Sequence, residues 1–252
     1  MNRETRSRGA TLILIRSVPN GRKKPATPVN PVSAQPQFAQ PSASPDPSKF
    51  TVAHGNDNPL YNKVQKNLLQ PIPAPRPGAN LTMTLDQVLG AGGAAAVAAI
   101  QKSGQIVFHA LGDTGSVKGP ETQSLVADKM VSDFADATPA DRPSFCFHLG
   151  DVVYSFGQAQ YYYDQFYEPY RSYPAPIFAV AGNHDGLVFT GEGVATLDAF
   201  LRNFVNAEAV RTPESGGLIR TAMTQPAVYF ALDAPFVTII GPYRNVLSKT
   251  LA

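Results

Sequence analysis

The sequence predicts an α/β domain in which helices cover a largely parallel sheet. Three near-continuous apolar runs, QIVFHALGD, SFCFHLGD and PIFAVAGNHD, end at Asp113, Asp151 and Asp185. Helical segments separate these runs, an arrangement that makes neighbouring strands parallel and buries both faces of their sheet. Each run also ends in a polar loop that contains glycine. We therefore expect adjacent strands whose carboxyl ends carry polar loops.

Residues 1–80 differ in composition from the rest of the chain. Thirteen of the 23 prolines lie there, and seven Lys or Arg residues fall between Arg3 and Lys24 against the single acid Glu4. Such a composition buries too little apolar surface to offset the entropy lost on ordering. We predict a mostly disordered, basic and Pro-rich arm over 1–80, with residues 71–80 as a polyproline II connector, and a globular domain over 81–252.

The first predicted helix spans residues 84–101, with Thr84 or Thr82 as its N-cap and Gly104 as its stop. It contains GAGGAA at 90–95, which fits the GxGxxG/A fingerprint of dinucleotide-binding folds. That fingerprint requires a strand that turns into a helix, whereas the preceding TLDQVL has helical character. We interpret the glycines instead as close packing of an Ala/Gly-rich helix on a neighbour.

Two further helices are predicted between and after the strands. Residues 124–137 place Leu125, Met130, Val131 and Phe134 largely on one face, and residues 159–173 do the same with aromatic side chains. The later segments AVYFALD and FVTIIG are predicted to form two strands joined by a tight turn through Ala234 and Pro235. His109 and His148 lie inside apolar strands, where hydrogen-bonded histidines are more common than metal ligands.

Charge and cysteine content limit the function classes. A formal net charge of +2 is too small to argue for a nucleic-acid partner, and the single Cys146 excludes an internal disulfide framework. The run TLILI is shorter than a signal-peptide core and is followed by Arg16, and the apolar stretch 89–100 is too short to span a bilayer. We expect a soluble protein with no membrane partner. The compartment stays unknown, with the cytoplasm favoured, and the oligomeric state stays open.

Candidate functional residues lie in the loops that follow the three strand runs. The loops are GDTG with Asp113, GDVVY with Asp151 and Tyr154, and GNHD with Asn183, His184 and Asp185. One Asp after a strand is commonly a helix cap or a turn residue. Three such loops in series, at the edge where open α/β sheets form their crevices, predict a binding site instead.

These loops resemble the metallophosphoesterase superfamily and, within it, the purple acid phosphatases, whose successive signatures are GDxG, GDxxY and GNH followed by an acid. The resemblance covers roughly residues 108–185. Most members of the superfamily have DxH in the first motif, whereas this chain has Gly115 in place of that histidine and Tyr154 in the second motif. That combination is the purple acid phosphatase arrangement, in which a tyrosinate binds ferric iron.

The resemblance implies a role for each residue. Asp113 would be a ligand of the first metal, Asp151 the bridge between both metals, Tyr154 the ferric-iron ligand and Asn183 a ligand of the second metal. His184 would be a catalytic histidine that stabilises phosphoryl charge or protonates the departing alkoxide. The cofactor would be a dinuclear centre of Fe(III) with Fe(II), Zn or Mn, because carboxylates and phenolate are hard donors suited to Fe(III). A metal-bound hydroxide would hydrolyse a phosphate ester, with monoesters as the default substrate.

Complete members of this family form an α/β/β/α sandwich and carry two further motifs, VxxH and GHxH. No histidine follows His184 in the 252 residues. The resemblance therefore implies the N-terminal half of that sandwich, truncated at its C-terminus, with a weakened metal site. Two hypotheses remain open: a phosphoesterase completed by sequence that is not shown, and a non-catalytic remnant or metal-binding and interaction module.

Overall fold

The structure is a computed structural model, which describes residues 72–116, 119–135, 137–154, 156–188 and 195–243. All of these residues lie in one compact unit of the chain. Of the arm predicted for residues 1–80, residues 1–71 lie outside the described residues. In the described remainder of the predicted connector, the Arg76 side chain donates to the carbonyls of Thr224 and Gln225. This part of the connector is therefore hydrogen-bonded to the domain.

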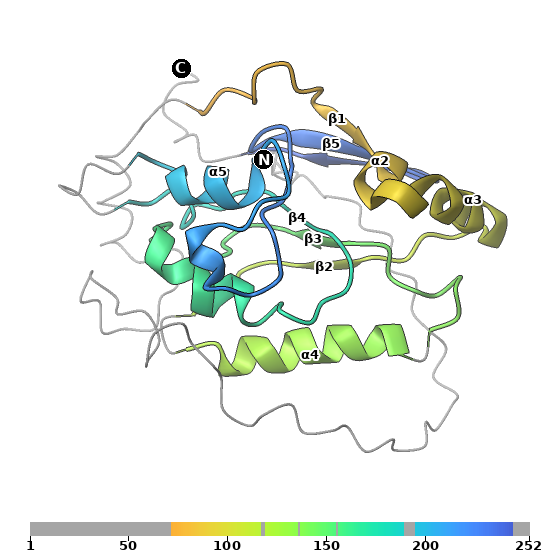
Figure 1. The fold of residues 1–252 in the computed structure, drawn as a ribbon, viewed down its shortest axis with the longest axis horizontal. Helices are drawn as coiled ribbons and strands as arrows, with labels where there is room; N and C mark the ends of the chain where they lie inside the picture. Colours follow the sequence, from red (N-terminus) through yellow and green to blue (C-terminus); the bar gives the residue numbers. More distant parts are fainter. Residues whose placement is uncertain (1–71, 117–118, 136, 155, 189–194, 244–252) are drawn as a thin grey trace, which may run out of the picture. The chain divides into compact units, whose positions relative to one another are not determined.

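Two three-stranded sheets form the centre of the domain (Figure 1). The sheet β2-β3-β4 consists of parallel strands at His109–Leu111, Cys146–His148 and Ile177–Ala179. The sheet β1-β5-β6 pairs Thr82–Thr84 in parallel with Phe230–Ala234, which pairs in antiparallel fashion with Val237–Gly241. The three parallel strands and the later strand pair are the ones that the sequence predicts. Strand β1 was missed, because three residues that pair with a strand far along the chain give no local signal.

Side-chain alternation on β3 and β4 separates two apolar cores. Phe147 and Phe178 point toward the other sheet, where both rings pack against Phe230 of β5 at centroid distances of 5.9 and 6.3 Å. The neighbouring residues Cys146 and Ile177 point the opposite way into a second core with the helices. The two sheets thus pack face to face with helices outside, which confirms the predicted α/β fold.

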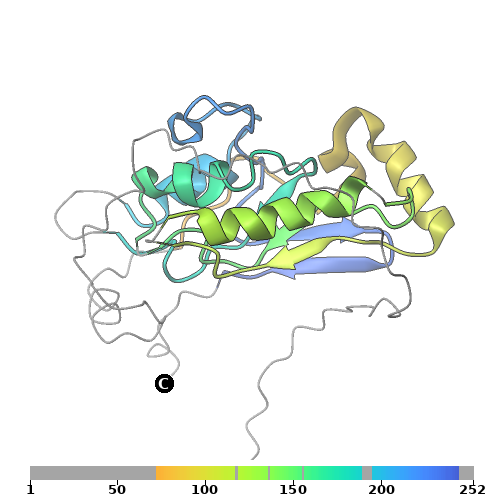
Figure 2. The same cartoon turned by 90° about the horizontal axis from the view of Figure 1, so that it is seen from below.

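Helix α4 (Glu121–Ala135) runs alongside the parallel sheet (Figures 1 and 2). Its buried residues are Gln123, Ala127 and Met130, with Val131 and Phe134 partly buried beside them. The prediction for Leu125 was wrong, because this side chain is 72% exposed. A helical register that buries Ala127 and Met130 turns residue 125 toward solvent.

The predicted helix 84–101 is interrupted at its glycines. It consists of α2 (Leu85–Leu89), a 3₁₀ turn η1 (Gly90–Gly92) and α3 (Gly93–Ser103), which ends at Gly104 in the left-handed conformation, as predicted. A Cβ atom at Gly93 would lie 1.8 Å from the backbone oxygen of Asp86, so only glycine fits where α3 meets α2. The GAGGAA segment follows a helix and serves close packing, as interpreted from the sequence.

The aromatic segment 159–173 is less regular than the single helix predicted for it. A 3₁₀ turn η2 (Ala159–Tyr161) leads into a π-helix η3 (Tyr163–Tyr167), in which the Glu168 amide bonds to the carbonyl of Tyr163 at 2.8 Å. Its rings nevertheless form much of the core against the parallel sheet, as the aromatic pattern indicated.

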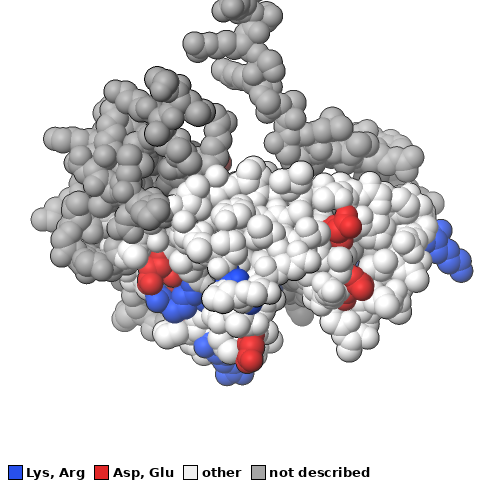
Figure 3. Space-filling view, turned by 90° about the horizontal axis from the view of Figure 1, so that it is seen from above, with Lys and Arg blue, Asp and Glu red and all other residues white. Residues whose placement is uncertain are grey.

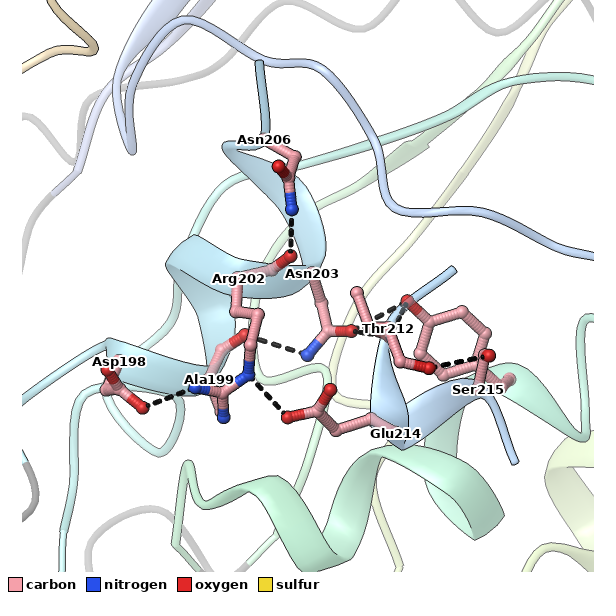
Figure 4. Close-up of polar contacts among 9 residues, drawn as sticks. Asp198, Ala199, Arg202, Asn203, Asn206, Thr212, Glu214 and Ser215 are labelled. Carbon is pink, nitrogen blue, oxygen red and sulfur yellow. Dashed lines mark hydrogen bonds and ion pairs between the residues drawn. The ribbon is translucent and has the colours of Figure 1, made fainter. Parts of the chain in front are cut away.

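Helix α5 (Asp198–Phe204) was not predicted, and it is fastened by polar contacts to the 3₁₀ turn η4 (Pro213–Ser215) (Figure 4). Arg202 contacts Asp198 at 3.0 Å and Glu214 at 2.6 Å. The Arg202–Glu214 pair joins the two elements, whereas the Arg202–Asp198 pair lies within α5.

Charged side chains on the face in Figure 3 are sparse, and lysines and arginines lie next to acidic residues on part of it. Among the described helices, none is long and apolar enough to cross a membrane.

Candidate metal centre

The loops that follow β2 and β3 lie against each other at the carboxyl edge of the parallel sheet. The Asp113 amide donates to the carbonyl of Gly150 at 3.0 Å, and the Thr114 amide donates to that of Asp151 at 3.2 Å. Asp113 and Asp151 both have left-handed backbones, with φ of 55° and 52°. Non-glycine residues seldom adopt this conformation, and such strain is concentrated at functional sites.

Three acidic oxygens converge between these loops. The hydroxyl oxygen of Tyr154 lies 2.6 Å from Asp113 Oδ1 and 3.0 Å from Asp151 Oδ2. A phenol has one proton, so it can donate to only one of the two carboxylates at a time. The other oxygen of Asp151, Oδ1, accepts the backbone amide of His184 at 2.9 Å, which connects the loop after β4 to the same group.

Burial favours the protonated forms of Tyr154 and Asp151. Burial, followed by the hydrogen bond to Asp113, raises the pKa of Tyr154 well above its ordinary range. Burial likewise raises the pKa of Asp151, and the charge of Asp113 adds to that effect. Three acids that repel one another when ionised form a site that a cation can occupy by displacing their protons.

The close approach of the two loops requires glycine at residue 115. A Cβ atom at residue 115 would lie 2.4 Å from Cδ2 of Tyr154 and 2.6 Å from its backbone nitrogen. The backbone of residues 153 and 154, together with the tyrosine ring, therefore occupies the space that a side chain at residue 115 would need. A histidine at residue 115 is excluded by this close approach of the two loops.

The carboxylate of Asp185 connects two of the loops that form the site, a role that the sequence did not reveal. Its carboxylate accepts the amides of Val152, Val153 and Gly182 at 2.8 to 3.2 Å, so it joins the loop after β4 to the loop after β3. The side chain is completely buried. Burial and the neighbouring Asp151 raise the pKa of Asp185 to about 7. Its position as the acid of GNHD was the one available signal.

The strand histidines are hydrogen-bonded, as predicted. His148 is buried, with Nε2 2.8 Å from Thr114 Oγ1, and its Nδ1 accepts the Gly150 amide. Burial lowers the pKa of His148 to about 4, so the ring is neutral and supports the Asp113 loop without charge. His109 contacts Tyr173 and Asp133.

The remaining predicted site residues lie in the loop after β4. Asn183 is half-buried and adjoins His184, and among the described residues no hydrogen-bond partner is assigned to its side chain. The ring of His184 is buried and packs on that of Tyr154 at a centroid distance of 4.3 Å. The structure thus brings both Asp113 and Asp151 into contact with the hydroxyl of Tyr154, and the ring of His184 against that of Tyr154. The roles of Asn183 and His184 stay predictions.

The residues present fit a metal ion with a preference for hard ligands, because two carboxylates and a phenol supply oxygen donors that share one small space. Within the described part of the chain, no group of three or more His, Cys, Asp or Glu side chains could hold a metal. The candidate site has two such side chains, Asp113 and Asp151, and its third oxygen donor is the phenol of Tyr154.

Two buried glutamines join distant segments, and no motif marks them; only Gln165 contacts a residue of the candidate site. Gln165 contacts the backbone of Tyr154, and Gln225 contacts that of Ala179. Both contacts join residues that are distant in the sequence, so a local pattern could not reveal them.

The fold and the candidate site define an α/β domain with two carboxylates and a phenol at the carboxyl edge of a parallel sheet. Residues 106–223 match the family model of the calcineurin-like phosphoesterases, a region that includes every candidate ligand. No curated protein and no solved structure matches the chain. A calcineurin-like phosphoesterase domain indicates metal-dependent hydrolysis of phosphate esters, and such domains typically bind a dinuclear metal centre.

Proposed function

We propose that this chain is a phosphoesterase of the purple acid phosphatase kind, which binds Fe(III) through Tyr154 and hydrolyses phosphate monoesters. The observation that carries the proposal is the position of the Tyr154 hydroxyl between Asp113 and Asp151. The lack of space at Gly115 supports it as well, because it excludes the histidine that most members of the superfamily have in the first motif.

Each side chain has a defined task in this proposal. Asp113 and Tyr154 hold the ferric ion, Asp151 bridges to a divalent Fe, Zn or Mn ion, and Asn183 contributes its amide oxygen to that second ion. The metal pair, when bound, supplies Lewis acidity and lowers the pKa of a water molecule. Asp151 and Tyr154 are buried, so their oxygens are held in place before substrate arrives, which reduces the reorganisation needed during the reaction.

His184 has the task of binding the phosphoryl oxygens and protonating the leaving alkoxide. Its backbone amide is fixed by Asp151 at 2.9 Å, and its ring by contact with Tyr154. Histidine is a common proton donor in catalysis because the ordinary pKa of its side chain lies close to neutral pH.

Iron reconstitution tests the proposal directly. The purified chain is titrated with Fe(III) and a divalent ion, and bound metal, visible absorbance and hydrolysis of an aryl phosphate are measured. We expect a tyrosinate-to-iron band and phosphatase activity. Tyr154→Phe should remove the band, whereas Tyr173→Phe should keep it, because Tyr173 precedes β4 and bonds to His109 at the opposite edge of the sheet.

The alternative, a domain without catalysis, predicts a different result. A folded wild-type protein that takes up no iron and hydrolyses no aryl phosphate would contradict the proposed activity. Iron uptake with the band but without hydrolysis would leave a metal-binding module.

A further inference from the structure

We propose that Gln165 is a positioning residue that holds Tyr154 and the Asp113 loop in the geometry required to bind the metal. This inference rests on the proposed function, which assigns Tyr154 to the metal. Gln165 itself contacts neither a proposed ligand side chain nor the substrate, and it acts through the backbone of the two loops.

One side-chain amide joins both ligand-bearing loops. Gln165 Oε1 accepts the amide of Ser116 at 2.9 Å and the amide of Tyr154 at 2.8 Å. Its Nε2 donates to the carbonyl of Tyr154 at 2.7 Å. Both backbone polar groups of Tyr154 therefore bond to Gln165, which leaves the residue little freedom to rotate about its own backbone.

These contacts determine where the phenol lies. Ser116 is three residues after Asp113, and Tyr154 is three residues after Asp151. Gln165 thus fixes the far end of each loop, while the hydrogen bonds between the loops fix their near ends at Asp113 and Thr114. The position of the Tyr154 hydroxyl between the carboxylates depends on both.

Gln165 is rigid because of its own surroundings. It is 1% exposed and lies in the π-helix η3, whose wider turn is a feature often found at functional sites. The side chain of Gln123 in α4 donates to the Gln165 carbonyl at 2.7 Å. Helix α4 therefore fixes the backbone from which the Gln165 amide reaches the loops.

A second buried glutamine offers a matched control. Gln225 Oε1 accepts the Ala179 amide at 2.6 Å and its Nε2 donates to the Ala179 carbonyl at 2.8 Å. It is equally buried and makes the same paired contact, but with strand β4 rather than with a residue assigned to the metal. Loss of a glutamine contact in general can thus be separated from loss of the contact with Tyr154.

The test compares Gln165→Met and Gln225→Met, which keep side-chain length and remove the amide. Hydrogen exchange is measured on the metal-free protein. In Gln165→Met, the amides of Ser116 and Tyr154 should exchange at least about tenfold faster, while those of Val152 and Val153 stay protected by Asp185.

Iron binding gives the readout that a purely structural role would not change. Loss of supporting residues around metal ligands typically costs about 10- to 100-fold in affinity. We expect a loss in that range for Gln165→Met, with a weaker or shifted tyrosinate band, and wild-type affinity and band for Gln225→Met.

The outcomes separate the two ideas. Iron uptake by the wild type with equal affinity in both methionine variants would overturn the positioning role alone. A wild type that takes up no iron would overturn the proposed function, and the positioning role with it. Should Gln165→Met not fold, Gln165→Glu decides, because it keeps the acceptor oxygen for both amides. That variant loses the donor to the Tyr154 carbonyl, so a loss of iron affinity that Gln225→Glu does not share would support the role, and equal affinity in the two glutamate variants would contradict it.

Discussion

Gly182→Ala should damage the proposed metal site without removing any proposed ligand. Gly182 directly precedes Asn183, and its backbone packs closely against the carboxylate and the backbone nitrogen of Asp151. A Cβ atom at 182 would lie 2.1 Å from Asp151 Oδ1 and 2.4 Å from the Asp151 backbone nitrogen. Contacts below 3.0 Å are essentially never seen for real Cβ atoms, so one of the two loops must move.

The size of that movement determines the expected effect. The carboxylate must retreat by about 0.9 Å to reach 3.0 Å from the new atom, and it belongs to the proposed bridging ligand. A misplacement of about 1 Å in a catalytic group costs on the order of 100-fold in rate. Forcing an extra methyl group into a packed region costs about 1 to 3 kcal/mol of unfolding free energy.

Urea unfolding of the metal-free protein measures the stability, and iron titration with aryl phosphate hydrolysis measures the site. Gly92→Ala is the matched control. A Cβ atom there meets nothing within 4 Å, and the φ angle of −99° suits alanine. We expect the control to match the wild type in stability, iron affinity and rate.

Wild-type iron affinity in Gly182→Ala, with a stability change under about 0.5 kcal/mol, would refute this reasoning. It would mean that the two loops are free to separate, and that the contacts between Asp151 and the loop after β4 do not fix the carboxylate.

Three further predictions concern metal linkage, protonation and the support of α5. Fe(III) at about 100 times its Kd should raise the free energy of unfolding by about 2.7 kcal/mol, as measured by calorimetry, and Asp151→Asn should lose most of this gain. An equal gain in the wild type and in Asp151→Asn would contradict the ligand assignment. Burial lowers the pKa of His148 from 6.5 to about 4, so between these pH values the unfolded state binds a proton that the folded state does not. The stability present above pH 6.5 is therefore lost as the pH falls toward 4. Relative to His148→Gln, the wild type should lose about 2 kcal/mol in urea unfolding between pH 7 and pH 5, and parallel pH profiles would argue against a buried neutral ring. Asn203→Ala should lower the free energy of unfolding by about 2 to 4 kcal/mol, because Asn203 Oδ1 accepts hydrogen bonds from the hydroxyls of Tyr167 and Thr212 at 2.6 and 2.8 Å. It should leave iron affinity unchanged, and a parallel loss of affinity would show that α5 supports the site.

The sequence predicted the three parallel strands and the loops after them because their signals are local. Each strand is an uninterrupted apolar run, and each loop follows at once, so the topology alone brings Asp113 and Asp151 to one edge. The closeness of Tyr154 to both carboxylates was available only through the resemblance. No periodicity or composition specifies where a phenol three residues beyond a strand loop will point.

The contacts that hold these loops could not be predicted, since they join distant segments. Gln165 bonds to a residue 49 positions earlier, and Gln225 to one 46 positions earlier. The error at Leu125 has a related cause. Its helix has apolar residues on more than one side, and only packing against the sheet decides which of them are buried.

The strained backbone at Asp113 and Asp151 links these observations. Two non-glycine residues in the left-handed region cost free energy, and they persist only if their surroundings hold them there. Asp185 and Gln165 do so through hydrogen bonds to backbone amides, and both are nearly or fully buried. The supports therefore lie beneath the loops, in the packed core, whereas the carboxylate of Asp113 remains exposed at the surface. A site built in this way is ordered before any metal arrives, so the damage expected from Gly182→Ala should already be present in the metal-free protein.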